Sequence, residues 1–219
     1  MYPEPIIPSE DYAKGLEKLQ ILEGISCIGK TSYMDKAKEE GYAAMTLDYF
    51  SFLDTTFGKA HKWHHKSHDS ILASAYGGTL QLKMVSFVMQ NRDAKGIKID
   101  RGLLSDFVYN LLFGDDLDWM FNTPQGILRE FQRLWYEQRM TSVVMGACGH
   151  ELDKYFICVD SDYETVTRRM RDRNTTLDNY FLNTYPNYVE VQTLVWTYVA
   201  TELGIQWCDL KGQFISDVL

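Results

Sequence analysis

Five short runs of mostly apolar residues recur along the chain, each with the length of a strand rather than of a helix. They are KLQILE (18–23), GYAAMTLD (41–48), GIKID (96–100), KYFICVD (154–160) and GIQWCDL (204–210). Segments with helical spacing separate them, such as TLQLKMVSFVMQNR at 79–92. Strands that alternate with helices form βαβ units, which make the sheet parallel and cover both of its faces. The pattern therefore predicts an α/β protein with a five-stranded parallel sheet.

The chain shows no internal repeat and no low-complexity linker, so the sequence predicts a single domain. Residues 1–17 are predicted to be a leader and residues 18–219 the folded domain. The middle of the chain is mostly helical to about Met140. The segment TSVVMGA at 141–147 fits either an extra strand or the approach to the strand at 154–160.

Composition narrows the class of protein. With 45% apolar and 24% charged residues, the 219-residue chain is typical of a globular domain with one substantial core. Its net charge of −8 argues against a nucleic-acid polymer as the main partner. No run approaches the ~18 apolar residues of a membrane span, and the N-terminus lacks the pattern of a signal peptide. The four cysteines have no C-x-x-C spacing, so we expect a cytoplasmic, reducing location.

One motif carries specific chemistry. EGISCIGKTS at 23–32 fits the pattern G-x-x-x-x-G-K-[ST] between a predicted strand and a predicted helix. The two glycines let amide groups turn inward, and the positive end of the helix completes a nest for phosphate. Lys30 is expected to reach the phosphates of ATP, and the Thr31 hydroxyl to bind Mg²⁺. The predicted triphosphate contacts are Gly24, Ile25, Ser26, Cys27, Ile28, Gly29, Lys30, Thr31 and Ser32.

Two acidic residues end predicted strands at the edge where open parallel sheets bind ligands: Asp48 and Asp100. Phosphorylation of a hydroxyl needs a proton acceptor, Mg²⁺ and positive charge around the transferred group. We predict that Asp48 is the base, that Asp100 holds Mg²⁺ through water and that Arg101 positions the acceptor oxygen. A helix cap or a solvated turn is the alternative for either acid.

A basic segment, TRRMRDRN, predicts a lid near residues 168–178. On such a lid, arginines would close over the triphosphate and neutralise the charge that develops during transfer. We predict this role for Arg171 and Arg173. For Arg168 and Arg169 we predict a solvated helix face paired with nearby acids. The acids available for that pairing are Asp162, Glu164 and Asp172.

The order and spacing of several motifs resemble the deoxyribonucleoside kinases, the P-loop family that includes deoxycytidine, deoxyguanosine and mitochondrial thymidine kinases. ILEGISCIGKTS is similar to the family's I-E-G-N-I-x-x-G-K-S/T-T loop. LQLKMVSFVMQ looks like its F-Q helix, DRGLLSDF resembles E-R-S-x-x-S-D-R, and MRDRN resembles the lid motif L-R-G-R-N. These motifs span about residues 18–215.

The resemblance implies a P-loop kinase fold, which is a three-layer sandwich with an arginine-rich lid. It also implies a homodimer formed through helices. It implies phosphorylation of the 5′-hydroxyl of a deoxyribonucleoside, with ATP as donor and Mg²⁺ as cofactor. It places the base-reading glutamine on Gln81 and further substrate contacts on Tyr76 and Asp106, beside Asp48 and Arg101. The nucleobase stays open, because Val88 suits thymidine-accepting members whereas Asp106 suits deoxycytidine-type members.

Two departures from the family pattern bear on catalysis. DYFSF stands where the family usually has E-P-V-x-x-W, so Asp48 would replace a glutamate as the base. Gly102 stands where the family has a serine after its acid–arginine pair. Two alternatives therefore stay open: a thymidylate kinase-like nucleoside monophosphate kinase, and a nucleotide-binding protein without catalysis. The uncharged stretch at 25–28 disfavours the first, because that type usually carries an acid there.

Four histidines lie in HKWHHKSHDS, at 61, 64, 65 and 68. Their spacing would allow some of them to share a helix face, which makes a metal site conceivable. Apart from Asp69, no cysteine or spaced carboxylate completes such a site. We therefore predict a solvated insertion near the substrate mouth rather than a zinc site.

Overall fold

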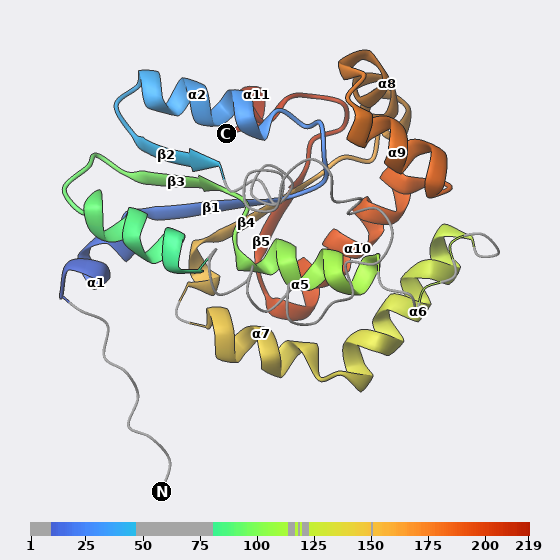
Figure 1. The fold of residues 1–219 in the computed structure, drawn as a ribbon, viewed down its shortest axis with the longest axis horizontal. Coiled ribbons are helices and arrows are strands. Elements are labelled where there is room, and N and C mark those ends of the chain that lie inside the picture. The colour runs from blue at the N-terminus through green and yellow to red at the C-terminus, as the bar shows by residue number, and fades with distance from the viewer. Residues whose placement is uncertain (1–9, 47–80, 114–116, 118, 120–122, 150) are drawn as a thin grey trace, which may run out of the picture.

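The computed structural model describes residues 10–46, 81–113, 117, 119, 123–149 and 151–219. Five strands form one sheet in which every neighbouring pair is parallel (Figure 1). They are β1 (Leu19–Gly24), β2 (Ala43–Thr46), β3 (Ile97–Asp100), β4 (Tyr155–Val159) and β5 (Gln206–Asp209). Their order across the sheet is β2-β3-β1-β4-β5. Each strand overlaps one of the five predicted runs, so the prediction of a five-stranded parallel sheet is confirmed.

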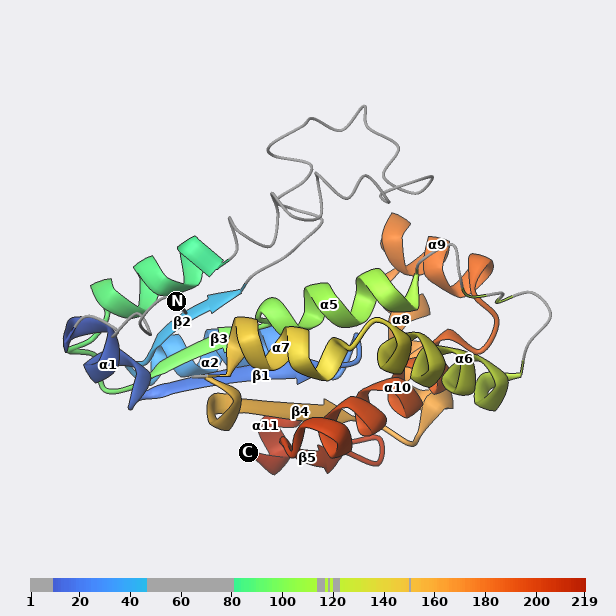
Figure 2. The same ribbon diagram turned by 90° about the horizontal axis from the view of Figure 1, so that it is seen from below.

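Helices cover both faces of the sheet, which is consistent with a three-layer sandwich (Figures 1 and 2). On one face, α2 (Lys30–Glu39) packs against β2 and β3, and α11 (Ile215–Val218) packs against α2. On the other, α5 (Leu103–Leu112) and α10 (Tyr188–Leu203) pack against β1. Outside them lie α6 (Pro124–Glu137) and α7 (Met140–Cys148).

The segment at 141–147 forms most of α7, so neither of its two predicted states, a strand or an approach to one, is correct. Its buried residues are Met140, Val144 and Cys148, spaced four apart, whereas Val143 and Met145 are exposed. Packing of this helical face against α5 and α6 overrides the strand preference of adjacent valines.

The remaining elements lie at the two ends of the sheet. Near its amino edge, α1 (Glu10–Leu16) contacts the domain, because the Tyr12 hydroxyl donates to Glu151 beside the 3₁₀ helix η2 (Leu152–Lys154). At the carboxyl edge, α8 (Tyr163–Arg173) and α9 (Thr176–Thr184) follow β4 (Figure 1). They occupy the segment predicted to be the lid. Residues 81–90 are also helical.

The largest side chains of the core come from helices on the outer layer of the sandwich. Phe131 and Trp135 of α6 and Trp196 of α10 are almost completely buried where these two helices meet. Within the described ranges, no helix is both long and apolar enough to cross a membrane.

Candidate functional site

The carboxyl ends of β1 and β4 meet where the strand order reverses. From β1 the chain continues toward β2, and from β4 toward β5, so the two connections leave this point in opposite directions. Open parallel sheets bind ligands at such a switch point. The glycine loop, residues 24–29, connects β1 to α2 there, at the end of the sheet where α8 and α9 also lie (Figure 1).

The backbone of the glycine loop has the conformation that its glycines allow. Gly24 has φ +116°, and a Cβ there would lie only 1.8 Å from the Cys158 carbonyl oxygen, so no other residue fits. Gly29 and Cys27 also have positive φ, of 90° and 60°. Within the described residues, the amides of residues 26–31 donate no backbone hydrogen bond. This geometry is compatible with the predicted nest for phosphate.

Lys30, the first residue of α2, is buried inside the glycine loop. Its Nζ donates hydrogen bonds to the carbonyl oxygens of Ile25 at 2.6 Å and Gly24 at 3.4 Å. Burial lowers the pKa of Lys30 to about 8, with a further decrease from Arg101 that Asp100 opposes. At pH 7 the ammonium group is therefore still mainly protonated and can attract an anion.

Thr31 and Asp100 lie together at the edge of the loop. The Thr31 hydroxyl donates to Asp100 Oδ2 at 3.4 Å, and Asp100 is buried at the end of β3. Its other oxygen, Oδ1, is buried without a hydrogen-bond partner in the described part of the chain. Mg²⁺ binds through one or two protein oxygens plus phosphates and water, so this pair fits the predicted site. No group of three potential metal-binding side chains occurs among the residues described.

Glu23, which precedes the glycine loop, is fully buried beside the first turn of α5. Its Oε1 accepts hydrogen bonds from the amides of Gly102 at 2.7 Å and Ser105 at 3.1 Å. Its Oε2 accepts from the Ser105 hydroxyl. Burial raises the pKa of Glu23 to about 7, although Ser105 and Arg101 favour the charged form. The carboxyl group thus joins β1 to α5 underneath the site.

Arg101 connects the end of β3 to α5 and has the left-handed φ of 69°. Its Nη1 donates to Ser105 Oγ at 3.2 Å and to the Tyr109 hydroxyl at 3.1 Å. The Tyr109 hydroxyl donates in turn to Gln192 of α10 at 3.0 Å. Burial alone would lower the pKa of Arg101, but Tyr109 and the nearby carboxylates raise it above its usual value. The guanidinium is a permanent cation in a defined position.

Asp106 lies one helical turn further along α5, with its carboxylate accepting from Asn110 Nδ2 at 3.2 Å. Burial raises the pKa of Asp106 to about 6, and the Asn110 hydrogen bond opposes that rise. Asp106 is partly buried, and no side-chain cation pairs with it in the described residues.

The predicted contacts on the nucleoside side are only partly described. Asp48, Tyr76 and the histidine cluster at 61–68 lie outside the described residues. Gln81 is exposed in the helical segment 81–90. Val88 is fully buried against Gly15, since a Cβ on that glycine would lie 2.6 Å from Val88 Cγ1. Val88 therefore packs against α1, and its apolar character carries no information about the nucleobase.

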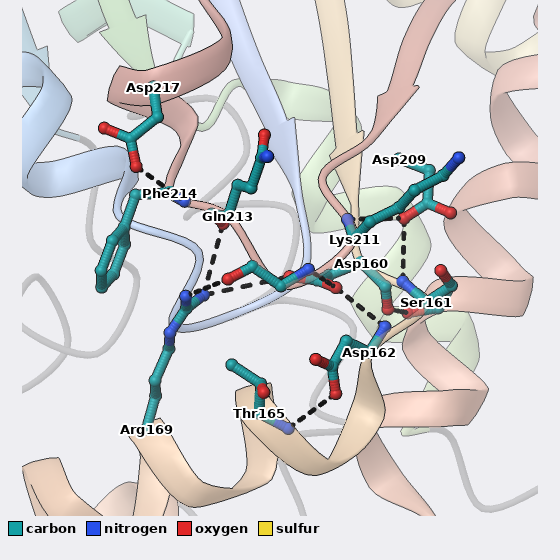
Figure 3. A network of polar contacts seen from close by, with 12 residues as sticks. Asp160, Ser161, Asp162, Thr165, Arg169, Asp209, Lys211, Gln213, Phe214 and Asp217 are labelled. Carbon is teal, nitrogen blue, oxygen red and sulfur yellow. Dashed lines mark hydrogen bonds and ion pairs between the residues drawn. The ribbon is translucent and has the colours of Figure 1, made fainter.

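The interpretation of Arg169 as part of a solvated face is wrong. Its side chain is only 17% exposed, and its Nη2 donates to the Gly212 carbonyl at 2.5 Å in the loop after β5. Its guanidinium also lies 3.9 Å from Asp160 Oδ2 and 3.9 Å from the centre of the Phe214 ring. Figure 3 shows this side chain reaching from α8 to the C-terminal loop. Arg168 is exposed, as predicted.

The two arginines predicted to contact phosphate end α8. Arg171 is exposed. Arg173 donates two hydrogen bonds, of 2.7 and 2.5 Å, to the carboxylate of Asp178 on α9. Its side chain is 52% exposed, so this pairing is compatible with the predicted contact to phosphate. Its charge opposes the rise that burial causes in the pKa of Cys27, which places Arg173 near the glycine loop.

Sequence reasoning missed the polar residues that support the site from below: Glu23, Ser105, Tyr109 and Gln192. Glu23 and Ser105 stand inside the quoted motifs EGISCIGKTS and DRGLLSDF, so their place beside candidate residues was a usable signal. Tyr109 and Gln192 lie outside the quoted motifs. No pattern in the sequence links them, because they are 83 positions apart.

No family model matches the chain, and a search of curated proteins finds no relative.

Proposed function

We propose that this chain is a nucleoside kinase, which transfers the γ-phosphate of ATP to the 5′-hydroxyl of a deoxyribonucleoside. The observation that carries the proposal is the grouping at the carboxyl edge of the sheet. There the glycine loop, the buried ammonium of Lys30, the pair of Thr31 with Asp100 and the cation Arg101 lie together. Phosphoryl transfer needs this combination of amide nest, positive charge and carboxylate.

In this proposal the donor side is held by the glycine loop and Lys30, which bind the β- and γ-phosphates. Thr31 and Asp100 would hold Mg²⁺, Thr31 through its hydroxyl and Asp100 through water. When bound, the ion would neutralise the negative charge of the phosphates. Arg171 and Arg173 add positive charge from the end of α8, and Arg173 lies near the loop.

On the acceptor side, Arg101 aligns the 5′-oxygen and Asp48 accepts its proton. The bond from that oxygen to the γ-phosphorus forms as the bond from the γ-phosphorus to the β–γ bridging oxygen breaks, so ADP leaves with the electron pair. Gln81 reads the nucleobase, with Tyr76 and Asp106 as further contacts. The resemblance in motif order supports these assignments, as does the position of Arg101 just before α5 and of Asp106 in its first turn.

The test is ATP-dependent phosphate transfer, with Mg²⁺, to the four deoxyribonucleosides and their monophosphates. We expect product from at least one nucleoside, and its loss in Asp48→Asn and in Lys30→Met. Lys38→Met, a change of an exposed lysine on the same helix, is the matched control and should keep the activity. Arg133→Ala, an exposed arginine on α6, is the control for loss of activity in Arg173→Ala.

Each of the other outcomes would indicate a different function for this protein. Product from a monophosphate alone would contradict the nucleoside as acceptor and indicate a thymidylate kinase-like enzyme. Binding of ATP without any product would indicate a nucleotide-binding protein that has no catalysis. The homodimer implied by the family resemblance stays a prediction, and the molar mass in solution tests it.

A further inference from the structure

The first turn of α5 has no capping side chain of its own. Its N-cap residue is Gly102, which has no side-chain oxygen to accept a hydrogen bond from the helix amides. A helix end buried in this way needs acceptors from elsewhere, because unpaired buried amides are costly. The acceptors come from a different element, the strand β1, whose residue Glu23 lies 79 positions earlier than Gly102.

The Glu23 carboxylate takes the place of the missing cap. Its Oε1 accepts from the amide of Gly102 at 2.7 Å and from the amide of Ser105 at 3.1 Å, which are the N-cap and N3 positions. A negative charge at this end of a helix is also favoured by the aligned peptide dipoles. Because Glu23 belongs to the central strand, the cap ties the start of α5 rigidly to the sheet.

The capped turn is the one that directs Arg101. That residue holds a left-handed φ of 69°, which a residue with a side chain keeps only when its surroundings enforce it. Its amide donates to the Leu22 carbonyl at 2.9 Å, one residue before Glu23. The Ser105 hydroxyl links the two charges, since it donates to Glu23 Oε2 and accepts from Arg101 Nη1 at 3.2 Å.

Burial excludes a direct part for Glu23 in the reaction. Its exposed fraction is 0%, and that of Ser105 is 6%, so neither side chain reaches a bound substrate. An ionised carboxylate in such a place is stable only when charges and donors compensate for the lost water. Arg101 and Lys30 provide the compensating charges.

We propose that Glu23 is a positioning residue: by capping α5 from β1, it holds Arg101 in the orientation that the acceptor hydroxyl requires. The inference rests on the proposed function, in which Arg101 aligns that hydroxyl. In this proposal, the geometry of the nucleoside half of the site depends on a helix cap that joins β1 to α5. The ATP half depends on the glycine loop instead, so loss of the cap affects the two substrates unequally.

The test compares Glu23→Gln with Glu151→Gln, which changes a buried glutamate away from the site. Glutamine keeps the shape and one acceptor but removes the charge that faces Arg101. We expect kcat/KM for the nucleoside to fall roughly 10- to 100-fold, as a small misplacement of an aligning group does. The KM for ATP should change less than about twofold. A proportional loss for both substrates, or an equal loss in Glu151→Gln, would show a general structural role and overturn the proposal.

A second variant covers the case in which Glu23→Gln does not fold. Ser105→Ala removes the link between the two charges but leaves both amides bonded to Glu23. We expect the same unequal effect on the two substrates, with a smaller loss, and less than additive losses in the double variant. Full activity of Ser105→Ala would contradict the link.

Hydrogen exchange of the Gly102 and Ser105 amides gives a readout that does not need activity. Exchange should be faster than in the wild type in Glu23→Ala, which removes both acceptor oxygens, and unchanged in Glu151→Ala. Unchanged exchange in Glu23→Ala would overturn the cap itself. A wild-type chain that transfers no phosphate would overturn the proposed function and the alignment of an acceptor with it, whereas exchange would still decide whether Glu23 caps α5.

Discussion

Glu23 is an ionisable group in a place without water, and its titration has a consequence for stability. Burial raises the pKa of its carboxyl to about 7, against the opposing effects of Ser105 and Arg101, whereas the ordinary value is 4.5. The folded protein therefore holds this proton more tightly than the unfolded chain does. The favourable contribution is complete below about pH 4.5 and disappears as the pH rises through about 7.

This difference predicts how stability depends on pH. Relative to Glu23→Gln, the wild type should lose roughly 3 kcal/mol of unfolding free energy between pH 4.5 and 8. Urea unfolding of both proteins at several pH values measures the difference in their unfolding free energy. Groups that titrate alike in both proteins do not contribute to this difference. A difference that stays constant with pH would contradict the raised pKa.

The space around Gly102 is too small for a side chain. A Cβ at this position would lie 2.8 Å from the Tyr155 hydroxyl oxygen and 3.0 Å from Ile21 Cγ2. A serine, which stands here in the motif that the sequence resembles, would therefore crowd this site, and Glu23 supplies the cap that a serine could have formed. The glycine at this position thus has a structural reason.

We predict that Gly102→Ser lowers the unfolding free energy by about 1–3 kcal/mol through overpacking. In a Tyr155→Phe background the loss should be smaller, because the closest atom is gone. Gly146→Ser is the control, since no atom lies within 4 Å of a Cβ there. An equal loss in both backgrounds would show that Tyr155 is not the obstacle.

At the scale of elements, one aspartate joins the turn after β4 to the loop after β5. Asp160 Oδ1 accepts from the amides of Asp162 at 2.9 Å and Gly212 at 2.8 Å, and Oδ2 faces Arg169 (Figure 3). The loop then reaches the glycine loop, because the amide of Ile215 donates to the Ile28 carbonyl at 3.1 Å. The position of α8 is thereby connected to the phosphate side of the site.

We expect Asp160→Ala to lower the unfolding free energy by roughly 2 kcal/mol, because it leaves two partly buried amides without their acceptor. Asp153→Ala, at an exposed aspartate of η2, should stay within about 0.5 kcal/mol of the wild type. Chemical denaturation measures both. A small effect at Asp160 would mean that water replaces the carboxylate in this turn.

For the whole molecule, the proposed nucleotide site predicts stabilisation by ligand. ATP with Mg²⁺ at 100 times its Kd should add about 2.7 kcal/mol, which for a domain of this size raises Tm by about 5–11 °C. Lys30→Met should remove most of the rise, and Lys38→Met should keep it. Thermal unfolding with and without ligand provides the measurement, and no rise at saturating ATP would contradict the site.

Some features of this molecule follow from short stretches of sequence, whereas others depend on residues far apart along the chain. The five strands, their parallel arrangement and the helix after the glycine loop follow from patterns that span a few residues each. The segment at 141–147 was ambiguous because adjacent valines favour a strand, while burial of every fourth residue in α7 decides for a helix. Arg169 could be assigned only once the loop after β5, 43 residues away at Gly212, was placed beside it.

By itself the sequence determined the α/β class, the five strands, and the grouping of Lys30, Thr31, Asp100 and Arg101 near strand ends. Those features depend on local periodicity and on the rule that parallel strands share one carboxyl edge. Only the tertiary structure decided that Glu23 caps α5 and that Tyr109 joins Arg101 to Gln192. Such contacts join residues about 80 positions apart, and each depends on how close two backbones come, which no local pattern of side chains encodes.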